Sequence, residues 1–197
     1  VKAYPIKILL CTATHGSERP SVLALYNAMY NIVNHWDADP VLEFIRFNCE
    51  IAVVPLVNPY GFVNRSRGNV NGVDINRNYN TNSWQYGISD TSSPYYRGTA
   101  AASEAETRLM QNLIMSEPFD FVYDFHTHGN FTAYDQMFCW ASCGNGFEEL
   151  SFEIGQAVTK YTNASAIKNH DYDDAKMIGR NEVYADYAMI ADFADKI

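Results

Sequence analysis

The segment VPLVNPYGFVNRSRGNVNGVDINRNY, residues 54–79, is the part of the sequence from which the fold can be inferred. It begins within Ile51–Val57, a short apolar run of the kind that forms buried strands. Asn58-Pro59-Tyr60-Gly61 then predicts a turn that ends this strand. Polar segments that follow the carboxyl ends of strands bind the ligands of open α/β sheets. The segment therefore predicts an α/β fold with a ligand site at this strand end.

Three arginines, Arg65, Arg67 and Arg77, lie in this segment among asparagines and glycines, and Asp74 is its one acid. A planar guanidinium group matches a carboxylate with two parallel hydrogen bonds. The composition therefore indicates a site for a carboxylate or another oxygen anion. A solvated polar loop is the alternative interpretation, which the GVDINRNY sequence at residues 72–79 makes the weaker one.

Length and composition limit the classes to which the protein can belong. The chain has 197 residues, of which 47% are hydrophobic and 19% charged. This length suits one sizeable domain, so we expect residues 1–197 to form a single domain. The formal net charge of −9 argues against nucleic acid and anionic membrane surfaces as partners. The sequence contains no apolar run long enough to span a bilayer.

Strand and helix patterns alternate along the chain. Apolar runs predict strands at Ile6–Ala13, Ile51–Val57, Phe119–His126 and Met137–Ala141. Helical spacing of apolar residues predicts four helices, whose apolar sides are Val22/Tyr26/Met29/Val33/Trp36, Val41–Phe47, Leu109/Met110/Leu113/Ile114 and Phe147/Leu150/Ile154/Val158/Tyr161.

The boundaries of two helices can also be predicted. Pro20 suits the first turn of the first helix, and Ser103–Glu106 has the form of a capping box that opens the third. The alternation of strands and helices predicts an α/β fold, a single-domain α/β/α sandwich with a mixed, mostly parallel central sheet.

Four motifs occur in order along the chain: His15-x-x-Glu18, Asn58-Pro59-x-Gly61-Phe62, Arg67 with Gly72-Val73-Asp74-x-Asn76-Arg77-Asn78, and Asp124-x-His126. Together they resemble the motifs of the zinc carboxypeptidases, the funnelin-type metallocarboxypeptidases. The resemblance implies a zinc-dependent enzyme that hydrolyses the C-terminal residue of peptides. Its partner would be a peptide with a free C-terminus.

One zinc ion is the cofactor that the resemblance implies. Catalytic zinc takes three protein ligands and keeps a fourth position open. His15 and Glu18 lie three residues apart just beyond a strand end, where a turn can aim both at one point. The third ligand is His126 or His128, which share a face if the strand continues. The Asp-x-His pattern of the family selects His126, and the resemblance makes Asp74 the hydrogen-bond partner of His15.

The remaining motif residues would contact substrate. The resemblance gives Arg67 the role of stabilising the oxyanion that forms during attack on the peptide carbonyl, with Arg65 as the alternative. It assigns Asn76 and Arg77 to the free C-terminal carboxylate. Such a contact is what distinguishes an exopeptidase from a general zinc endopeptidase.

Two family features have no clear counterpart in the sequence. One is the general-base glutamate of a late strand, for which Glu153 and Glu182 lack the expected neighbours. Tyr184–Ala188 resembles the element before that strand, so we expect the glutamate at or beyond Ile197. The chain would then be an incomplete catalytic domain, truncated at its C-terminal end and possibly at its N-terminal end. The other feature is the capping tyrosine, for which Tyr172 and Tyr184 are candidates.

Three alternatives to this function stay open. A peptidase of peptidoglycan stems and an acyl-amino-acid deacylase are related enzymes, although Asn58–Phe62 favours a carboxypeptidase over the deacylase. A non-catalytic zinc-bearing module that binds carboxylates is the third. The four cysteines are too few for a disulfide scaffold, and pairing of Cys139 with Cys143 stays open. A secreted or periplasmic location is favoured over a cytoplasmic one.

Overall fold

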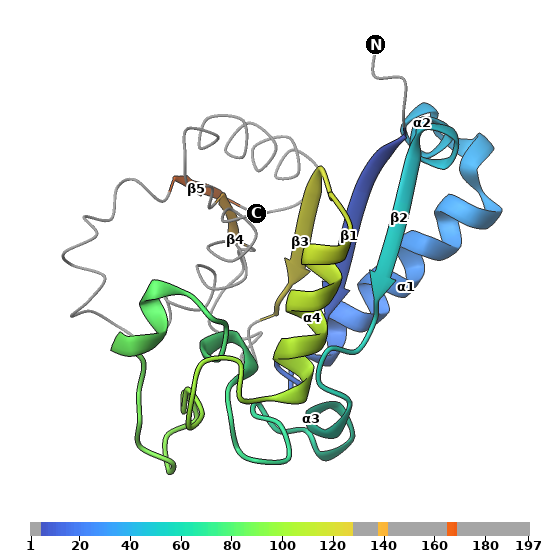
Figure 1. Ribbon diagram of the computed structural model, residues 1–197. Coiled ribbons are helices and arrows are strands. Elements are labelled where there is room, and N and C mark those ends of the chain that lie inside the picture. Colours follow the sequence, from blue (N-terminus) through green and yellow to red (C-terminus); the bar gives the residue numbers. More distant parts are fainter. Residues whose placement is uncertain (1–4, 128–137, 142–164, 169–197) are drawn as a thin grey trace.

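The computed structural model describes residues 5–127, 138–141 and 165–168 (Figure 1). In chain order its elements are β1 (Ile6–Thr12), α1 (Arg19–Asn34), η1 (Trp36–Ala38), α2 (Pro40–Asn48), β2 (Cys49–Val54), α3 (Pro59–Asn64), η2 (Ile75–Arg77), η3 (Asn82–Tyr86), α4 (Ala105–Ser116), β3 (Phe121–Phe125), β4 (Phe138–Ala141) and β5 (Ser165–Lys168). Among these residues, no helix is both long enough and apolar enough to cross a membrane.

The described strands form two parallel sheets. The larger has the order β2-β1-β3, in which Ile8 of β1 lies opposite Ile51 on one side and Phe121 on the other. The smaller pairs β4 with β5. The predicted α/β class and parallel sheet are confirmed, whereas the antiparallel strand that a mixed sheet requires is not among the described strands. Because parallel strands need long crossovers, helices connect β1, β2 and β3.

Helices lie on both faces of the three-stranded sheet. Side chains of a strand alternate between faces, and Leu9 and Cys11 of β1 pack in one buried cluster with Met110 and Ile114 of α4. Figure 1 shows α4 on this face and α1 on the opposite one. The predicted sandwich of two helical layers around a sheet is therefore confirmed.

The buried side of α1 differs from the predicted one. Leu25 and Ile32 are buried, whereas Tyr26 is 64% exposed and Val33 49% exposed. This helix carries apolar residues on more than one side, so helical periodicity alone could not select the side that faces the sheet. The same reason applies in α4, where Leu109 is exposed although it was predicted to be buried.

Two predicted boundaries change for identifiable reasons. The strand β2 ends at Val54, because Pro55 has no N–H to continue the ladder. The segment after it is the short helix α3 rather than a simple turn: the Asn58 side chain accepts a hydrogen bond from the Gly61 N–H at 2.8 Å, and Pro59 takes the first helical position.

The predicted capping box of α4 is wrong. The N-cap is Glu104, and its side chain makes no capping hydrogen bond. The Ser103 hydroxyl instead donates to the Glu104 carboxylate at 2.6 Å, and the Glu106 carboxylate accepts from Asn69 Nδ2 at 3.2 Å, so both side chains of the predicted box serve a different network.

The predicted helix around 147–161 lies outside the described residues. The same holds for His128, Glu153, Glu182, Tyr172, Tyr184 and the pairing of Cys139 with Cys143. Within the described part, Cys11 and Cys49 are free thiols.

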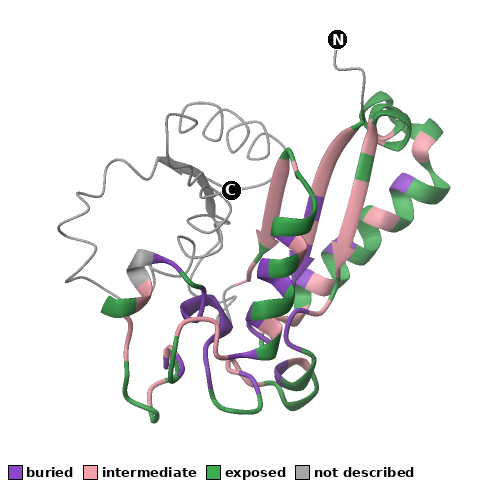
Figure 2. Cartoon of the chain, viewed as in Figure 1, coloured by how far each residue is buried: buried purple, intermediate pink, exposed green. Residues whose placement is uncertain are grey.

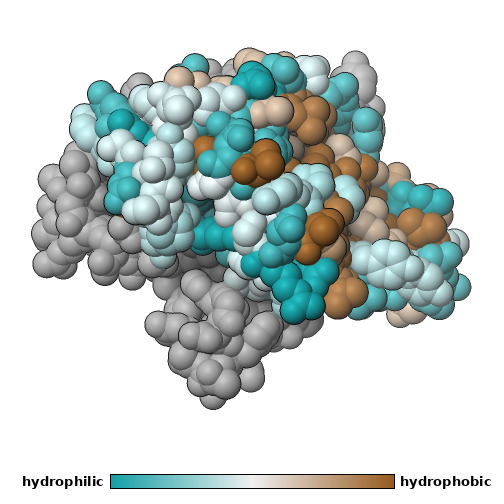
Figure 3. All heavy atoms as spheres, turned by 90° about the horizontal axis from the view of Figure 1, so that it is seen from below, coloured by the Kyte–Doolittle hydropathy of each residue, from teal (hydrophilic) through white to brown (hydrophobic). Residues whose placement is uncertain are grey.

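The core continues from the sheet into the segment that follows α3. We call residues 65–78 the arginine loop. Figure 2 shows buried residues in this region as well as between the sheet and α4. Asp74, Asn76 and Asn78 are completely buried, and Ile75 belongs to the same cluster as Leu9. The alternative of a solvated polar loop is therefore wrong. Viewed from below, the surface mixes hydrophilic side chains with scattered apolar ones (Figure 3).

Candidate metal centre and active site

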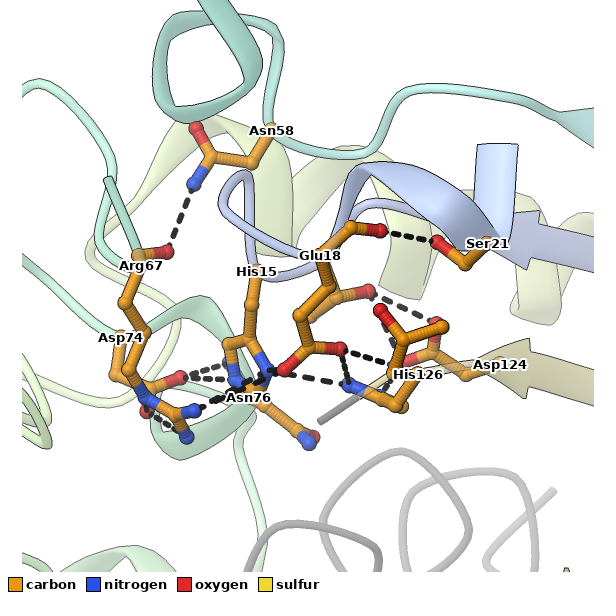
Figure 4. A network of polar contacts seen from close by, with 11 residues as sticks. His15, Glu18, Ser21, Asn58, Arg67, Asp74, Asn76, Asp124 and His126 are labelled. Carbon is orange, nitrogen blue, oxygen red and sulfur yellow. Dashed lines mark hydrogen bonds and ion pairs between the residues drawn. The ribbon is translucent and has the colours of Figure 1, made fainter. Parts of the chain in front are cut away.

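Two neighbouring parallel strands bring the three predicted metal ligands together. His15 and Glu18 follow β1, and His126 directly follows β3. The two strands are in register at their ends, with Thr12 opposite Phe125. Since parallel strands end at the same edge of a sheet, these side chains meet there and face one another (Figure 4).

The loop between β1 and α1 is shaped by two unusual backbone positions. Ala13, at φ 56°, turns the chain sharply at the end of β1. Gly16 lies directly against Gly61 of α3, because a Cβ on Gly16 would fall 1.9 Å from the Gly61 carbonyl carbon. The Glu18 N–H donates to the His15 carbonyl oxygen at 3.0 Å, and Glu18 is the N-cap of α1. The short turn therefore presents the side chains of His15 and Glu18 to one point.

The ligand atoms lie at the mutual distances that a shared metal ion requires. His15 Nδ1 is 2.8 Å from Glu18 Oε1, His126 Nδ1 is 3.1 Å from Glu18 Oε2, and the two Nδ1 atoms are 3.1 Å apart. Two ligands of one tetrahedral zinc, each about 2 Å from it, are separated by roughly 3.3 Å. Among the described residues these three form the one group able to hold a metal.

Each histidine uses its other ring nitrogen to contact a carboxylate. His15 Nε2 is 3.1 Å from Asp74 Oδ1, and His126 Nε2 is 2.8 Å from Asp124 Oδ2. With Nε2 donating to these oxygens, Nδ1 of each neutral ring presents a lone pair. Two lone pairs and a carboxylate oxygen that face one another fit a divalent cation, and two imidazoles with one carboxylate suit zinc.

The pairing of Asp124 with His126 is a contact within the candidate site that the sequence analysis missed. The Asp-x-His motif contained the signal, because residues two apart on a strand share a face. The Thr14 hydroxyl lies 3.0 Å from both Asp124 oxygens and so helps to hold this carboxylate.

The carboxylates of the site favour positive charge around His15 and His126. Burial opposes charge on His15, but Asp74 and Glu18 outweigh it and raise the pKa of the ring. Burial likewise opposes charge on His126, and Asp124 and Glu18 raise its pKa well above the ordinary value. Burial would raise the pKa of Glu18, yet its hydrogen bonds with His126 and His15 lower it. These carboxylates therefore favour positive charge at this point, which a bound metal ion would supply.

Asp74 connects His15, one of the predicted metal ligands, to Arg67. Its Oδ2 accepts from Arg67 Nε at 2.8 Å and is 2.7 Å from Arg67 Nη2, while its Oδ1 contacts His15. Burial would raise the pKa of Asp74, but His15 and the arginines outweigh it and lower the pKa. Arg67 Nη1 reaches to 4.0 Å from Glu18 Oε1. Arg65, the alternative to Arg67 in the sequence analysis, is exposed at the C-cap of α3.

Asn76 and Arg77 lie in η2, which begins directly after Asp74. The Asn76 N–H donates to Asp74 Oδ1 at 3.0 Å, and both residues are buried. The Arg77 guanidinium lies 5.5 Å from the centre of the Tyr95 ring. All seven residues predicted for the site are therefore in one region, and the roles assigned to them stay predictions.

A buried hydrogen-bond network fastens the arginine loop to α4. Glu104 Oε2 accepts from Asn69 Nδ2 and from Asn71 Nδ2, each at 2.7 Å. Asn78 Nδ2 donates to the Arg97 and Ala100 carbonyl oxygens, and Asn78 Oδ1 accepts from the Glu104 N–H at 3.0 Å. The many asparagines of the loop thus satisfy buried backbone and side-chain groups.

The chain belongs to the zinc carboxypeptidase family, whose model matches residues 5–194. Carboxypeptidase SOL1 of Arabidopsis thaliana is 34% identical over 65 residues, which make up 33% of this chain and 13% of that protein. The family is one of zinc enzymes, and the described residues contain a group of two histidines and one glutamate that could hold a metal ion.

Solved structures share the fold at low sequence identity. Carboxypeptidase A from Helicoverpa armigera matches with a TM-score of 0.68 and 19% identity, over 82% of this chain and 44% of that one. Thrombin activatable fibrinolysis inhibitor matches with a TM-score of 0.68 and 12% identity, over 87% of this chain and 49% of that one. The chain therefore spans slightly less than half the length of these two proteins.

Proposed function

We propose that the protein is a zinc-dependent carboxypeptidase, which hydrolyses the peptide bond before the C-terminal residue of a peptide. The observation that carries this proposal is the mutual contact of His15 Nδ1, His126 Nδ1 and the Glu18 carboxylate, with Arg67 beside them. Membership of the zinc carboxypeptidase family supports the same reaction class.

The metal ligands would hold one zinc ion, which when bound polarises a peptide carbonyl and lowers the pKa of its water. Asp74 and Asp124 keep the Nε2 proton on the two histidines, so that each Nδ1 is presented as a ligand. Arg67 is held by Asp74 within reach of the same point. Its guanidinium is therefore available for the negative charge that develops on the carbonyl oxygen.

Arg77 and Asn76 supply the recognition of a C-terminus. Arg77 is a buried cation whose charge acts on Asp74, the carboxylate that contacts His15, and a free carboxylate is a ligand that its fork matches with two hydrogen bonds. Asn76 adds an amide from the same short helix. A substrate held by its terminal carboxylate would place its last peptide bond near Arg67 and the metal ligands.

The carboxylates that border the ligands in residues 5–127 already have partners. Glu18 is itself a ligand candidate, and Asp74 and Asp124 each contact one histidine. A carboxylate that would accept a proton from the attacking water is therefore not among these three.

Substitution of Arg77 tests the proposed substrate. We expect Arg77→Met to lower kcat/KM for free-acid peptides on the order of tenfold or more, since it removes a charge-assisted contact. The same substitution should hardly change the slow hydrolysis of amidated peptides. Arg65→Met is the matched control, because Arg65 is an exposed arginine close in sequence, and it should have little effect.

Zinc content and circular dichroism should be recorded for both variants, because Arg77 is buried. Equal losses on free-acid and amidated peptides would contradict the exopeptidase assignment. Binding of a free-acid peptide without zinc-dependent turnover would instead favour the non-catalytic carboxylate-binding module.

A further inference from the structure

One tyrosine ring contacts both arginines of the site. The Cζ atom of Arg67 lies 4.7 Å from the centre of the Tyr95 ring, and that of Arg77 lies 5.5 Å from it. Tyr95 is half-buried and comes from the long segment between η3 and α4. No motif of the sequence marked this residue.

The backbone on both sides of Tyr95 is fixed next to Asp74. The Asp74 N–H donates to the Tyr96 carbonyl oxygen at 2.8 Å, and the Tyr96 N–H donates to the Ser93 carbonyl oxygen at 3.2 Å. The Tyr95 N–H itself lies 3.2 Å from the Ser93 hydroxyl, to which it donates. The backbone next to Tyr95 is therefore hydrogen-bonded to Asp74, the residue that holds Arg67 and His15.

The contact has a physical reason in the charges involved. Two guanidinium groups close to each other repel, and the face of an aromatic ring attracts cations because of its quadrupole. An aromatic wall beside both groups offsets part of this repulsion and restricts the orientations that each arginine can adopt. A leucine at this position would fill similar space without the quadrupole.

We propose that Tyr95 is a positioning residue that holds Arg67 and Arg77 in one relative orientation. The inference rests on the proposed function, in which Arg67 serves the scissile carbonyl and Arg77 the terminal carboxylate. Both groups belong to the last two residues of one substrate, so the two arginines must be in place at once. Tyr95 acts through them and needs only its ring face, not its hydroxyl.

Steady-state kinetics on a free-acid peptide provide the first test. Tyr95→Phe keeps the ring face and should stay within about twofold of the wild type in kcat and in KM. Tyr95→Leu should lower kcat through Arg67 and raise KM through Arg77, for a loss of about tenfold in kcat/KM. Tyr86→Leu, which changes an exposed tyrosine in η3, is the matched control and should have no effect. Zinc content and thermal unfolding verify that each variant is folded.

Proton NMR of the arginine side chains provides a test that does not depend on turnover. The Hε resonances of Arg67 and Arg77 should carry ring-current shifts that Tyr95→Phe keeps and Tyr95→Leu removes. Unchanged resonances in Tyr95→Leu would overturn the proposal, as would unchanged kinetics. Equal loss in Tyr95→Phe and Tyr95→Leu would overturn it too, because the hydroxyl would then be the active group. A wild type with the shifts but without hydrolysis would refute the proposed function and leave the placement of the arginines supported.

Discussion

At the scale of single residues, aspartate carboxylates orient the two histidines and one arginine of the site. Asp74 serves His15 and Arg67, and Asp124 serves His126. The resemblance to the zinc carboxypeptidases selected His126 and Asp74, and the structure brings both side chains to within 3.1 Å of His15. The contact between Asp124 and His126 was not inferred, although both residues stood in one motif.

Other contacts could not be predicted from the sequence. Strand periodicity does not separate His126 from His128, and nothing in the pattern marks Tyr95, whose position depends on packing between distant segments. Arg65 and Arg67 also fit the loop equally well in sequence. The structure places Arg67 against Asp74 because Arg65 is used at the exposed C-cap of α3.

Asp124→Asn should weaken zinc binding about 10-fold to 100-fold, since loss of a carboxylate partner typically has an effect of this size. The amide can present its NH₂ group to His126 Nε2 and so favour the wrong tautomer of the ring. Competition with a chromophoric chelator measures the affinity. Asp90→Asn is the control, because Asp90 is an exposed turn residue that contacts Ser92. An affinity for zinc equal to that of the wild type would show that Asp124 does not orient His126.

At the scale of elements, the strands were easier to predict than the helix faces. Apolar runs with turn residues after them identified β1, β2 and β3, and only their ends moved. The buried side of α1 was predicted incorrectly, because apolar residues on several sides leave more than one possible rotation. The hydrogen bonds around Glu104 could not be predicted from the sequence, since they join the arginine loop to α4 across more than thirty residues.

Glu104→Gln should lower the free energy of unfolding by about 1–3 kcal/mol at neutral pH, because an amide cannot accept all the bonds that the buried carboxylate accepts. Burial would raise the pKa of Glu104, but the hydrogen bonds from Ser103, Asn69 and Asn71 outweigh it and lower the pKa. A carboxyl group whose pKa is lowered by folding stabilises the protein above its unfolded pKa, roughly 4.3. The difference between wild type and variant should therefore shrink as the pH falls below about 4.

Urea unfolding at several pH values between neutrality and about pH 3 measures this difference. Glu43→Gln, on the exposed side of α2, is the control and should give a small difference at every pH. A difference between wild type and Glu104→Gln that grows on acidification would have the opposite sign and would reject this account.

At the scale of the whole molecule, the alternation of strands and helices predicted the sandwich, and the family membership agrees with it. The order of the strands could not be predicted, because it depends on which runs pair in space. That order matters for the site: β1 and β3 are distant in sequence, yet they are neighbours, and the predicted metal ligands follow their ends.

Zinc should therefore stabilise the whole fold, since it would join the ends of two strands. A free zinc concentration of about 100 times its dissociation constant raises the free energy of unfolding by roughly 2.7 kcal/mol. This corresponds to a rise of roughly 5–10 °C in Tm. His126→Ala should abolish this rise, and His128→Ala should retain it. Differential scanning fluorimetry with and without zinc gives the comparison. A rise that survives in His126→Ala and disappears in His128→Ala would make His128 the ligand.

The contact between Gly16 and Gly61 has a consequence for how the protein can change over evolution. Two main chains touch there, and a single methyl group would drive the turn that carries His15 and Glu18 away from α3. Asn58, the cap of α3, also donates its amide to the Arg67 carbonyl oxygen at 3.2 Å. Gly16, which has no side chain, thus sets the spacing between the predicted metal ligands and the arginines. We expect position 16 to tolerate less variation than many of the residues that would touch substrate.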